Sequence, residues 1–452
     1  MSPFFRHSLL LLVVIIFLIT SPLIILYAQG YRFNINTLEF TKTGTISIKT
    51  TPRGANIYLD NEIYEEASPA KIDSLKPQNY DLKITKEGYK SWETNLTVKP
   101  ELVTSATHII LFANQMLEKS IVQGKINNFS LSPDNKKIIY NIAEGENIGT
   151  WLQLKDRTET IKVSDIYFDE FNWSPDNKKV ILTRREEGRE RFGLLNVSEI
   201  KTAEDQAKIW ELGSLFQEPI EDLKWRPANS QKLFLRSENS LYEVDVEKSE
   251  ISMLFRDVYS YVPTSWGAVF IQKRNLGYFL ISKNYLWNEK LKIITRLPEA
   301  DQYKIIPGSK KTAIIAGDNL YLISDELPFK IATEVEDANW SPDGKRLLYF
   351  NEHQIGIYYL REEEKELLTR DSRELKNIGW WPRSQYVIFT VEGKIKFIDG
   401  AKEMNAHYIT EIKNTEMEET RINWSKNTKR IFYLTNIGQD ISALVEVELI
   451  QN

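Results

Sequence analysis

The sequence contains no cysteine among its 452 residues and only four histidines. Without thiols the chain forms no disulfide, has no cysteine nucleophile and offers no cysteine-ligated zinc or iron–sulfur site. Its formal net charge is −5, from 58 Lys and Arg against 63 Asp and Glu. Binding to phosphate backbones depends on an excess of cationic charge, so nucleic acid is excluded as the expected partner.

Recognisable catalytic motifs are also missing. The sequence has no Gly-x-Ser-x-Gly, no His-Glu-x-x-His and no glycine-rich phosphate loop ending in Lys-Ser or Lys-Thr. A histidine catalyst would have to be His353 or His407, and each is more simply explained as a surface residue. Paired carboxylates acting on a glycan remain as the enzymatic alternative. We expect no catalytic residue, no metal and no cofactor.

One long hydrophobic run is present, near the N-terminus. Leu9 to Ala28 is twenty residues without a charge, enough at about 1.5 Å per residue to cross a hydrocarbon core of roughly 30 Å. Leu26 and Ala28 occupy the positions where signal cleavage prefers small residues, so Leu26 disfavours cleavage. We expect a cytoplasmic tail at 1–8, a transmembrane helix at 9–28, and the rest of this single-pass cell-membrane protein outside.

Residues 43 to 113 predict short strands and turns. Ile46 and Ile48 alternate with polar residues, a turn follows at Pro52 to Gly54, and Ile57 and Leu59 form the next strand. This is the pattern of a β-hairpin within a small β-sandwich.

Four pieces of this segment resemble the PEGA domain. They are Pro52-Arg53-Gly54-Ala55, Tyr58-Leu59-Asp60, Ser68-Pro69 and Glu87-Gly88-Tyr89, in the order of that family. Arg53 departs from the family pattern, which has Glu there. The resemblance implies an exported accessory domain of the cell envelope, without catalytic residues.

One motif then recurs through residues 117 to 452. Copies are "FSLSPDNKKIIY" from Phe129, "FNWSPDNKKVILTR" from Phe171, "LKWRPANSQKLFLR" from Leu223, "ANWSPDGKRLLYF" from Ala338, "IGWWPRSQYVIF" from Ile378 and "INWSKNTKRIFYL" from Ile422, with weaker copies at Pro263 and Pro307. A unit of about 40 residues is the length of one four-stranded propeller blade. The copies resemble the TolB-type (WD40-like) β-propeller of bacterial envelope proteins. The expected fold class is therefore all-β, with a propeller of eight blades favoured and seven possible.

Two features of the motif have structural explanations. The Ser-Pro-Asp turns of three separate blades contain Asp134, Asp176 and Asp343. Carboxylates in separate blades cannot converge on one reacting atom, so we expect these residues to stabilise their turns. Large aromatics that precede the turn are expected to pack between neighbouring sheets, with a sugar-stacking surface as the alternative. They are Trp173, Trp225, Trp340, Trp380 and Trp424.

The last copy provides only three strands before the chain ends. The spare segment Leu117 to Lys125 precedes the first copy. We expect it to pair with Ala443 to Leu449, which removes an exposed sheet edge.

The loops joining second to third strands, and those joining blades, share the propeller face opposite the Ser-Pro-Asp turns. Candidate binding residues on that face are Arg184, Arg185, Arg191, Tyr259, Tyr261, Lys273, Arg274 and His353. Cationic and aromatic groups suit an acidic glycan or a polypeptide segment, although ordinary solvated loops are the simpler explanation. The sequence thus predicts a membrane-anchored, extracytoplasmic binding or scaffold protein of the envelope. The alternative is a membrane-tethered glycan-active hydrolase or lyase that uses propeller carboxylates.

Overall fold

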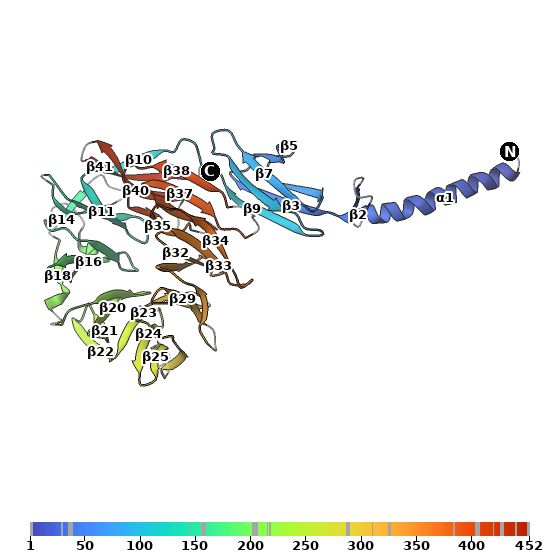
Figure 1. Ribbon diagram of the computed structural model, residues 1–452. Coiled ribbons are helices and arrows are strands. Elements are labelled where there is room, and N and C mark those ends of the chain that lie inside the picture. Colours follow the sequence, from blue (N-terminus) through green and yellow to red (C-terminus); the bar gives the residue numbers. More distant parts are fainter. Residues whose placement is uncertain are drawn as a thin grey trace. The chain divides into compact units, whose positions relative to one another are not determined.

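A computed structural model of the chain (Figure 1) describes residues 3–28, 30–34, 39–145, 147–154, 160–200, 207–214, 216, 218–285, 290–309, 311–323, 327–382, 385–402, 407–418, 420–424, 429–438 and 441–449. Residues 1 and 2 of the expected tail, and 450–452 of the expected propeller, lie outside these ranges. The chain divides into two compact units. Unit 1 contains residues 1–116, 398–410 and 449–452, and unit 2 contains residues 117–397 and 411–448.

Unit 1 begins with helix α1, Pro3–Ala28, which starts earlier than residue 9. Its stretch Leu9–Ala28 is long and apolar enough, by length and composition, to cross a membrane. The helix ends at Ala28, and a turn follows at Gly30, whose φ of 85° is one that glycine adopts readily and whose N–H donates to the Tyr27 carbonyl at 3.1 Å.

The rest of unit 1 is a hairpin and a small sandwich. The hairpin is β1 (Tyr31–Asn34) and β2 (Glu39–Lys42), one sheet has the order β6-β3-β9, and the other has the order β5-β4-β7-β8. These strands are β3 (Gly44–Thr51), β4 (Asn56–Leu59), β5 (Glu62–Tyr64), β6 (Ala70–Leu75), β7 (Asn79–Thr85), β8 (Trp92–Thr97) and β9 (Val103–Ile110). The two sheets enclose a common core that includes Ile46, Ile57 and Trp92.

The prediction that β3 and β4 form a hairpin was wrong. β3 pairs with β6 and β9, whereas β4 pairs with β5 and β7. Both strands have fully buried residues, Ile46 in β3 and Ile57 in β4. The turn at Pro52 to Gly54 therefore carries the chain from one sheet to the other, so that both strands contribute to the same core.

Unit 2 forms eight four-stranded sheets within the described part of the chain, which succeed one another in Figure 1. Sheet 1 is β11 (Ile126–Leu131), β12 (Lys137–Ile142), β13 (Gly149–Leu154) and β14 (Thr160–Ser164); sheet 2 is β15 (Glu170–Trp173), β16 (Lys179–Glu186), β17 (Arg189–Asn196) and β18 (Ile209–Glu211); sheet 3 is β19 (Asp222–Arg226), β20 (Asn229–Ser237), β21 (Ser240–Asp245) and β22 (Glu250–Phe255); sheet 4 is β23 (Val258–Pro263), β24 (Gly267–Arg274), β25 (Gly277–Asn284) and β26 (Lys292–Arg296). Short 3-10 turns, η1 (Val197–Glu199) and η2 (Leu212–Ser214), flank β18.

The second half repeats this pattern. Sheet 5 is β27 (Tyr303–Pro307), β28 (Thr312–Ala316), β29 (Asn319–Ile323) and β30 (Phe329–Ala332); sheet 6 is β31 (Asp337–Trp340), β32 (Arg346–Asn351), β33 (Gln354–Tyr359) and β34 (Glu364–Arg370); sheet 7 is β35 (Leu375–Trp380), β36 (Tyr386–Val391), β37 (Lys394–Asp399) and β38 (Ile409–Asn414); sheet 8 is β39 (Ile422–Trp424), β40 (Arg430–Gly438), β41 (Ile441–Glu448) and β10 (Glu118–Gly124). The all-β, propeller-like class is confirmed. Whether all eight sheets surround one axis stays a prediction.

The closure predicted from the incomplete last copy is confirmed. β10 pairs antiparallel with β41 and supplies the fourth strand of sheet 8. The Ser442 hydroxyl donates to the Gly124 carbonyl at 2.9 Å and accepts from the Ile126 N–H at 3.0 Å, which ties β41 to the start of sheet 1.

Three of the five motif tryptophans form hydrogen bonds between neighbouring sheets, in keeping with the expected packing role. Trp225, Trp340 and Trp380 each donate an indole N–H to a backbone carbonyl of the preceding sheet. The acceptors are Asn172, Ile306 and Asn339, at 3.0, 3.0 and 2.9 Å. The rings therefore serve as packing and hydrogen-bonding groups between sheets.

In the first two copies, the second lysine after the turn contacts the sheet that follows. Lys137 Nζ donates to the Asn177 carbonyl in the turn of sheet 2 at 3.0 Å, and Lys179 Nζ donates to the Ser230 carbonyl of sheet 3 at 3.3 Å. One copy of the motif thus contacts both the sheet before it and the sheet after it.

Candidate functional site

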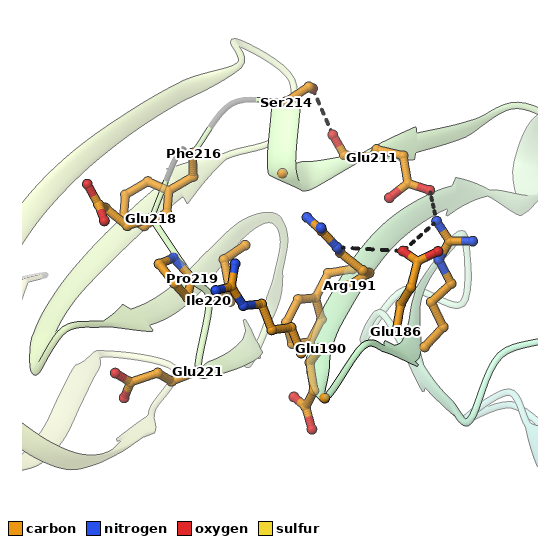
Figure 2. Close-up of a pocket in the computed structure, with 15 residues that line it drawn as sticks. Glu186, Glu190, Arg191, Glu211, Ser214, Phe216, Glu218, Pro219, Ile220 and Glu221 are labelled. Atoms are coloured by element: carbon orange, nitrogen blue, oxygen red, sulfur yellow. Dashed lines mark hydrogen bonds and ion pairs between the residues drawn. The ribbon is translucent and has the colours of Figure 1, made fainter.

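A pocket of about 590 Å³ lies where the β16–β17 hairpin of sheet 2 meets the segment from β18 to β19. The side chains around it are Arg184, Glu186, Arg189, Glu190, Arg191, Phe192, Glu211, Ser214, Phe216, Glu218, Pro219, Ile220 and Glu221. Figure 2 shows Glu186, Arg191 and Glu211 on one wall and Phe216, Pro219 and Ile220 on the facing wall. A hairpin between second and third strands and a segment joining two sheets therefore meet on one face, as the propeller pattern predicts.

The β16–β17 hairpin presents its arginines in a fixed register. Arg184 is opposite Arg191, and Arg185 is opposite Glu190. The turn uses Glu187 and Gly188, both at positive φ, which is the two-residue turn that suits the twist of a hairpin. Since side chains alternate along a strand, Arg184 and Arg185 point to opposite faces.

Among the described residues, Arg184 and Arg191 contact carboxylates only at long range. Arg184 Nη2 lies 3.6 Å from Glu186 Oε2 and 3.8 Å from Glu211 Oε1. Arg191 Nε lies 3.7 Å from Glu186 Oε2. These distances exceed a hydrogen bond. Arg184 Nε is buried and has no hydrogen-bond partner among the described residues. The donors that a ligand could reach on this wall are therefore the terminal guanidinium groups, whose contacts to carboxylates are long.

The facing wall is apolar, and most remaining carboxylates turn outward. In Figure 2 the carboxyl ends of Glu190, Glu218 and Glu221 point away from Arg191. Glu221 pairs with Arg236 at 2.5 Å, and Arg236 is not one of the residues that line the pocket.

A second pocket of about 240 Å³ lies beside the same hairpin, lined by Asp169, Glu170, Thr183, Arg185, Glu190 and Arg421. Arg421 Nη1 donates to Asn128 Oδ1 at 2.6 Å, which joins sheets 8 and 1 on this face. Arg185 thus lines a different pocket from Arg184 and Arg191.

The other predicted residues lie on later sheets. Lys273 Nζ is 5.5 Å from the centroid of the Tyr278 ring, and Tyr259 packs edge-on against that ring at 5.1 Å. Arg274 Nε donates to Gln272 Oε1 at 3.0 Å. His353 is exposed at the β32–β33 turn. None of these four residues lines either of the two pockets.

Tyr261 is not available to a ligand. Its side chain is 1% exposed and its hydroxyl donates to the Phe234 carbonyl of sheet 3 at 2.8 Å. Burial raises the pKa of this hydroxyl well above its usual value. The proposed binding role does not fit this position, which serves the packing of sheet 4 on sheet 3.

The three turn aspartates are structural, as expected. Each accepts a hydrogen bond of 2.6 Å from the serine two residues earlier, in the pairs Ser132–Asp134, Ser174–Asp176 and Ser341–Asp343. Partial burial opposes ionisation of these carboxyl groups. The serine hydroxyl, a backbone N–H and nearby lysines outweigh it, so the pKa of each falls below its usual value.

The charge of the main pocket differs from the cationic surface expected from the sequence. Five glutamates and three arginines line it. Glu211 and the apolar Phe216 and Ile220 were missed because they come from a segment outside the repeated motif. Among the described residues, no group of three His, Asp or Glu side chains suits a metal ion.

Comparison with known proteins identifies part of the chain. Residues 43–109 match the PEGA domain family. No curated protein matches the sequence. Similar solved structures include a eukaryotic initiation factor (14% identity, TM-score 0.47, covering 70% of this chain and 82% of that one) and the Dos1 propeller (10% identity, TM-score 0.48, covering 73% and 94%).

Proposed function

We propose that the chain is a membrane-anchored binding protein of the bacterial cell envelope, in which α1 is a permanent anchor and the residues after it are extracytoplasmic. The apolar stretch Leu9–Ala28 and the PEGA match support this placement. A protease added to intact cells that make the full chain should digest unit 2. Protection until the cells are lysed would contradict the topology.

The pocket between sheets 2 and 3 is the proposed binding site, and its ligand is a polypeptide segment that carries a carboxylate beside an apolar side chain. The observation that carries this proposal is the pairing of two unlike walls. Arg184 and Arg191 have only long-range contacts to carboxylates, and Phe216 lies on the other side. Arginine binds carboxylates bidentately, and an apolar wall gains from covering an apolar side chain.

A uniformly anionic glycan suits this pocket less well. Glu186 and Glu211 stand beside the arginines and would repel a second negative group. We further propose that the site binds its ligand without catalysis, so that a bound peptide or glycan is recovered unchanged.

Screening the full-length protein in detergent micelles against a random peptide display library, and in parallel against an array of acidic glycans, tests the proposal. Selected peptides should carry Asp, Glu or a free C-terminus next to an apolar residue. Arg191→Ala should weaken their binding at least about tenfold, because a charge-assisted hydrogen bond contributes about 1.5–3 kcal/mol.

Two controls make the result specific. Arg274→Ala removes an exposed arginine of another hairpin and should leave affinity unchanged. Asp176→Ala should lower stability without changing affinity. Peptides that bind Arg191→Ala as well as the parent, or selection of glycans alone, would refute the proposed ligand class. Cleavage of a glycan would favour the hydrolase or lyase alternative.

A further inference from the structure

The hairpin that follows α1 is fastened to the end of that helix. β1 starts at Tyr31, directly after the terminal turn at Gly30. Arg32 Nη1 donates to the Tyr27 carbonyl at 3.0 Å, and the Thr43 N–H donates to the Gly30 carbonyl at 3.1 Å. Figure 1 shows β2 next to the C-terminal end of α1. The position of the hairpin along the helix axis is therefore set by these bonds.

The hairpin carries an exposed aromatic pair. Phe33 and Phe40 are directly opposite each other across the two strands, with ring centroids 5.1 Å apart. They are 49% and 41% exposed, although they contact each other. Tyr27, in the last turn of the helix, is 65% exposed and lies under the Arg32 guanidinium at 3.8 Å.

Two cationic side chains of the hairpin contact the sandwich of the same unit. Arg32 Nη2 donates to Ser74 Oγ at 2.8 Å, and Lys42 Nζ pairs with Glu101 at 2.5 Å. Their partners thus hold the hairpin between the helix and the sandwich while the two rings remain uncovered.

We infer that the β1–β2 hairpin is a second membrane contact, in which Phe33 and Phe40 enter the interfacial layer of the leaflet that α1 leaves. The inference rests on the proposed anchoring by α1. Leu9–Ala28 fills a hydrocarbon core of about 30 Å, and each interfacial layer outside it is about 5–8 Å thick. A hairpin bonded to the last helical turn falls within that layer, where aromatic side chains are favoured.

Single cysteines allow a direct test because the chain has none of its own. Phe33→Cys and Phe40→Cys are made in the full-length protein, reacted with a nitroxide spin label and reconstituted in phosphatidylcholine vesicles. The measurement is the relative accessibility of the label to oxygen, which concentrates in lipid, and to a water-soluble nickel chelate. Ile63→Cys is the matched control, since Ile63 is an apolar residue of β5 in the same unit and is 63% exposed.

Labels at positions 33 and 40 should be several-fold more accessible to oxygen relative to nickel than the label at 63. A label at Ile16→Cys, within α1, reports whether the helix itself is in the bilayer. If position 16 is lipid-exposed while 33 and 40 resemble 63, the hairpin inference is wrong and the anchor stands. If 16 also resembles 63, both the anchor and the hairpin contact are refuted.

Discussion

Deleting residues 443–452, which hold most of β41, tests how the propeller is closed. β41 lies between β40 and β10, so the deletion leaves β10 without a partner. It also uncovers the core shared by sheets 8 and 1, which includes Phe432 and Leu434 of β40 and Phe129 of β11.

The cost follows from the side chains removed. Leu444, Val445 and Val447 are 0%, 4% and 1% exposed. Burying a side chain of this kind contributes about 1.5–3 kcal/mol, so the three together account for about 5–9 kcal/mol. Whole domains are stable by only about 5–15 kcal/mol. The truncated protein should therefore lose the cooperative unfolding transition of unit 2, or show it at a far lower temperature.

Thermal unfolding of the full-length protein in detergent, followed by circular dichroism and tryptophan fluorescence, measures this. Leu444→Ala is the milder variant and should cost about 2–5 kcal/mol, which lowers the Tm of a domain of this size by about 3–8 °C. Ile441→Ala is the matched control, because Ile441 belongs to the same strand and is 47% exposed. A truncated protein that keeps the parent Tm, or equal effects of the two alanine variants, would refute closure by β10 and β41.

Three further perturbations test the contacts within the repeat. Trp380→Phe keeps a ring but loses the bond to the Asn339 carbonyl, and should cost about 0.5–1.5 kcal/mol in urea unfolding; no loss would contradict a role between sheets. Gly379→Ala places a Cβ 2.6 Å from the ring of Trp424 and should destabilise by about 1–3 kcal/mol, measured in the same way, whereas a neutral result would mean that the ring moves freely. The carboxyl of Asp176 has a lowered pKa in the folded state, so the ionised group stabilises the fold above about pH 4, and this contribution is lost as the pH falls further. Asp176→Asn should therefore make the free energy of unfolding less dependent on pH below about pH 4, which unfolding measurements at a series of pH values would show.

The repeat made the strands of unit 2 predictable. The copy from Ala338 was expected to form one four-stranded unit, and it does so as β31, β32, β33 and β34. Each strand is defined by apolar residues close in sequence and by turn residues that act locally. The spare segment before the first copy could be matched to the incomplete last copy for the same reason.

Pairings between distant segments were not predictable in the same way. β3 pairs parallel with β9, more than fifty residues later, and the alternation of Ile46 and Ile48 fits that partner as well as a hairpin with β4. The main pocket combines a hairpin with Phe216 and Ile220, which belong to no repeated pattern. Loop arginines were identified by charge, but the glutamates that face them depend on strand register.

Tyr261 shows why an eroded copy of the motif misled the prediction. It precedes Pro263 by two residues, just as Trp225 precedes Pro227, so it occupies the tryptophan position of its copy. Its hydroxyl donates to a carbonyl of the preceding sheet, as the indole N–H groups of Trp225, Trp340 and Trp380 do.

Tyr261→Phe should therefore remove the same kind of contact as Trp380→Phe, at a larger cost because the Tyr261 hydrogen bond is buried and that of Trp380 is only partly buried. The variant keeps the buried ring and leaves the Phe234 carbonyl without this donor, at a cost of about 1–3 kcal/mol because a buried polar group that loses its partner is not rehydrated. Urea unfolding of the full-length protein measures the loss, and affinity for any peptide selected against the parent should stay the same. Unchanged stability combined with weaker peptide binding would indicate that Tyr261 binds the ligand and would contradict its assignment as a contact between sheets.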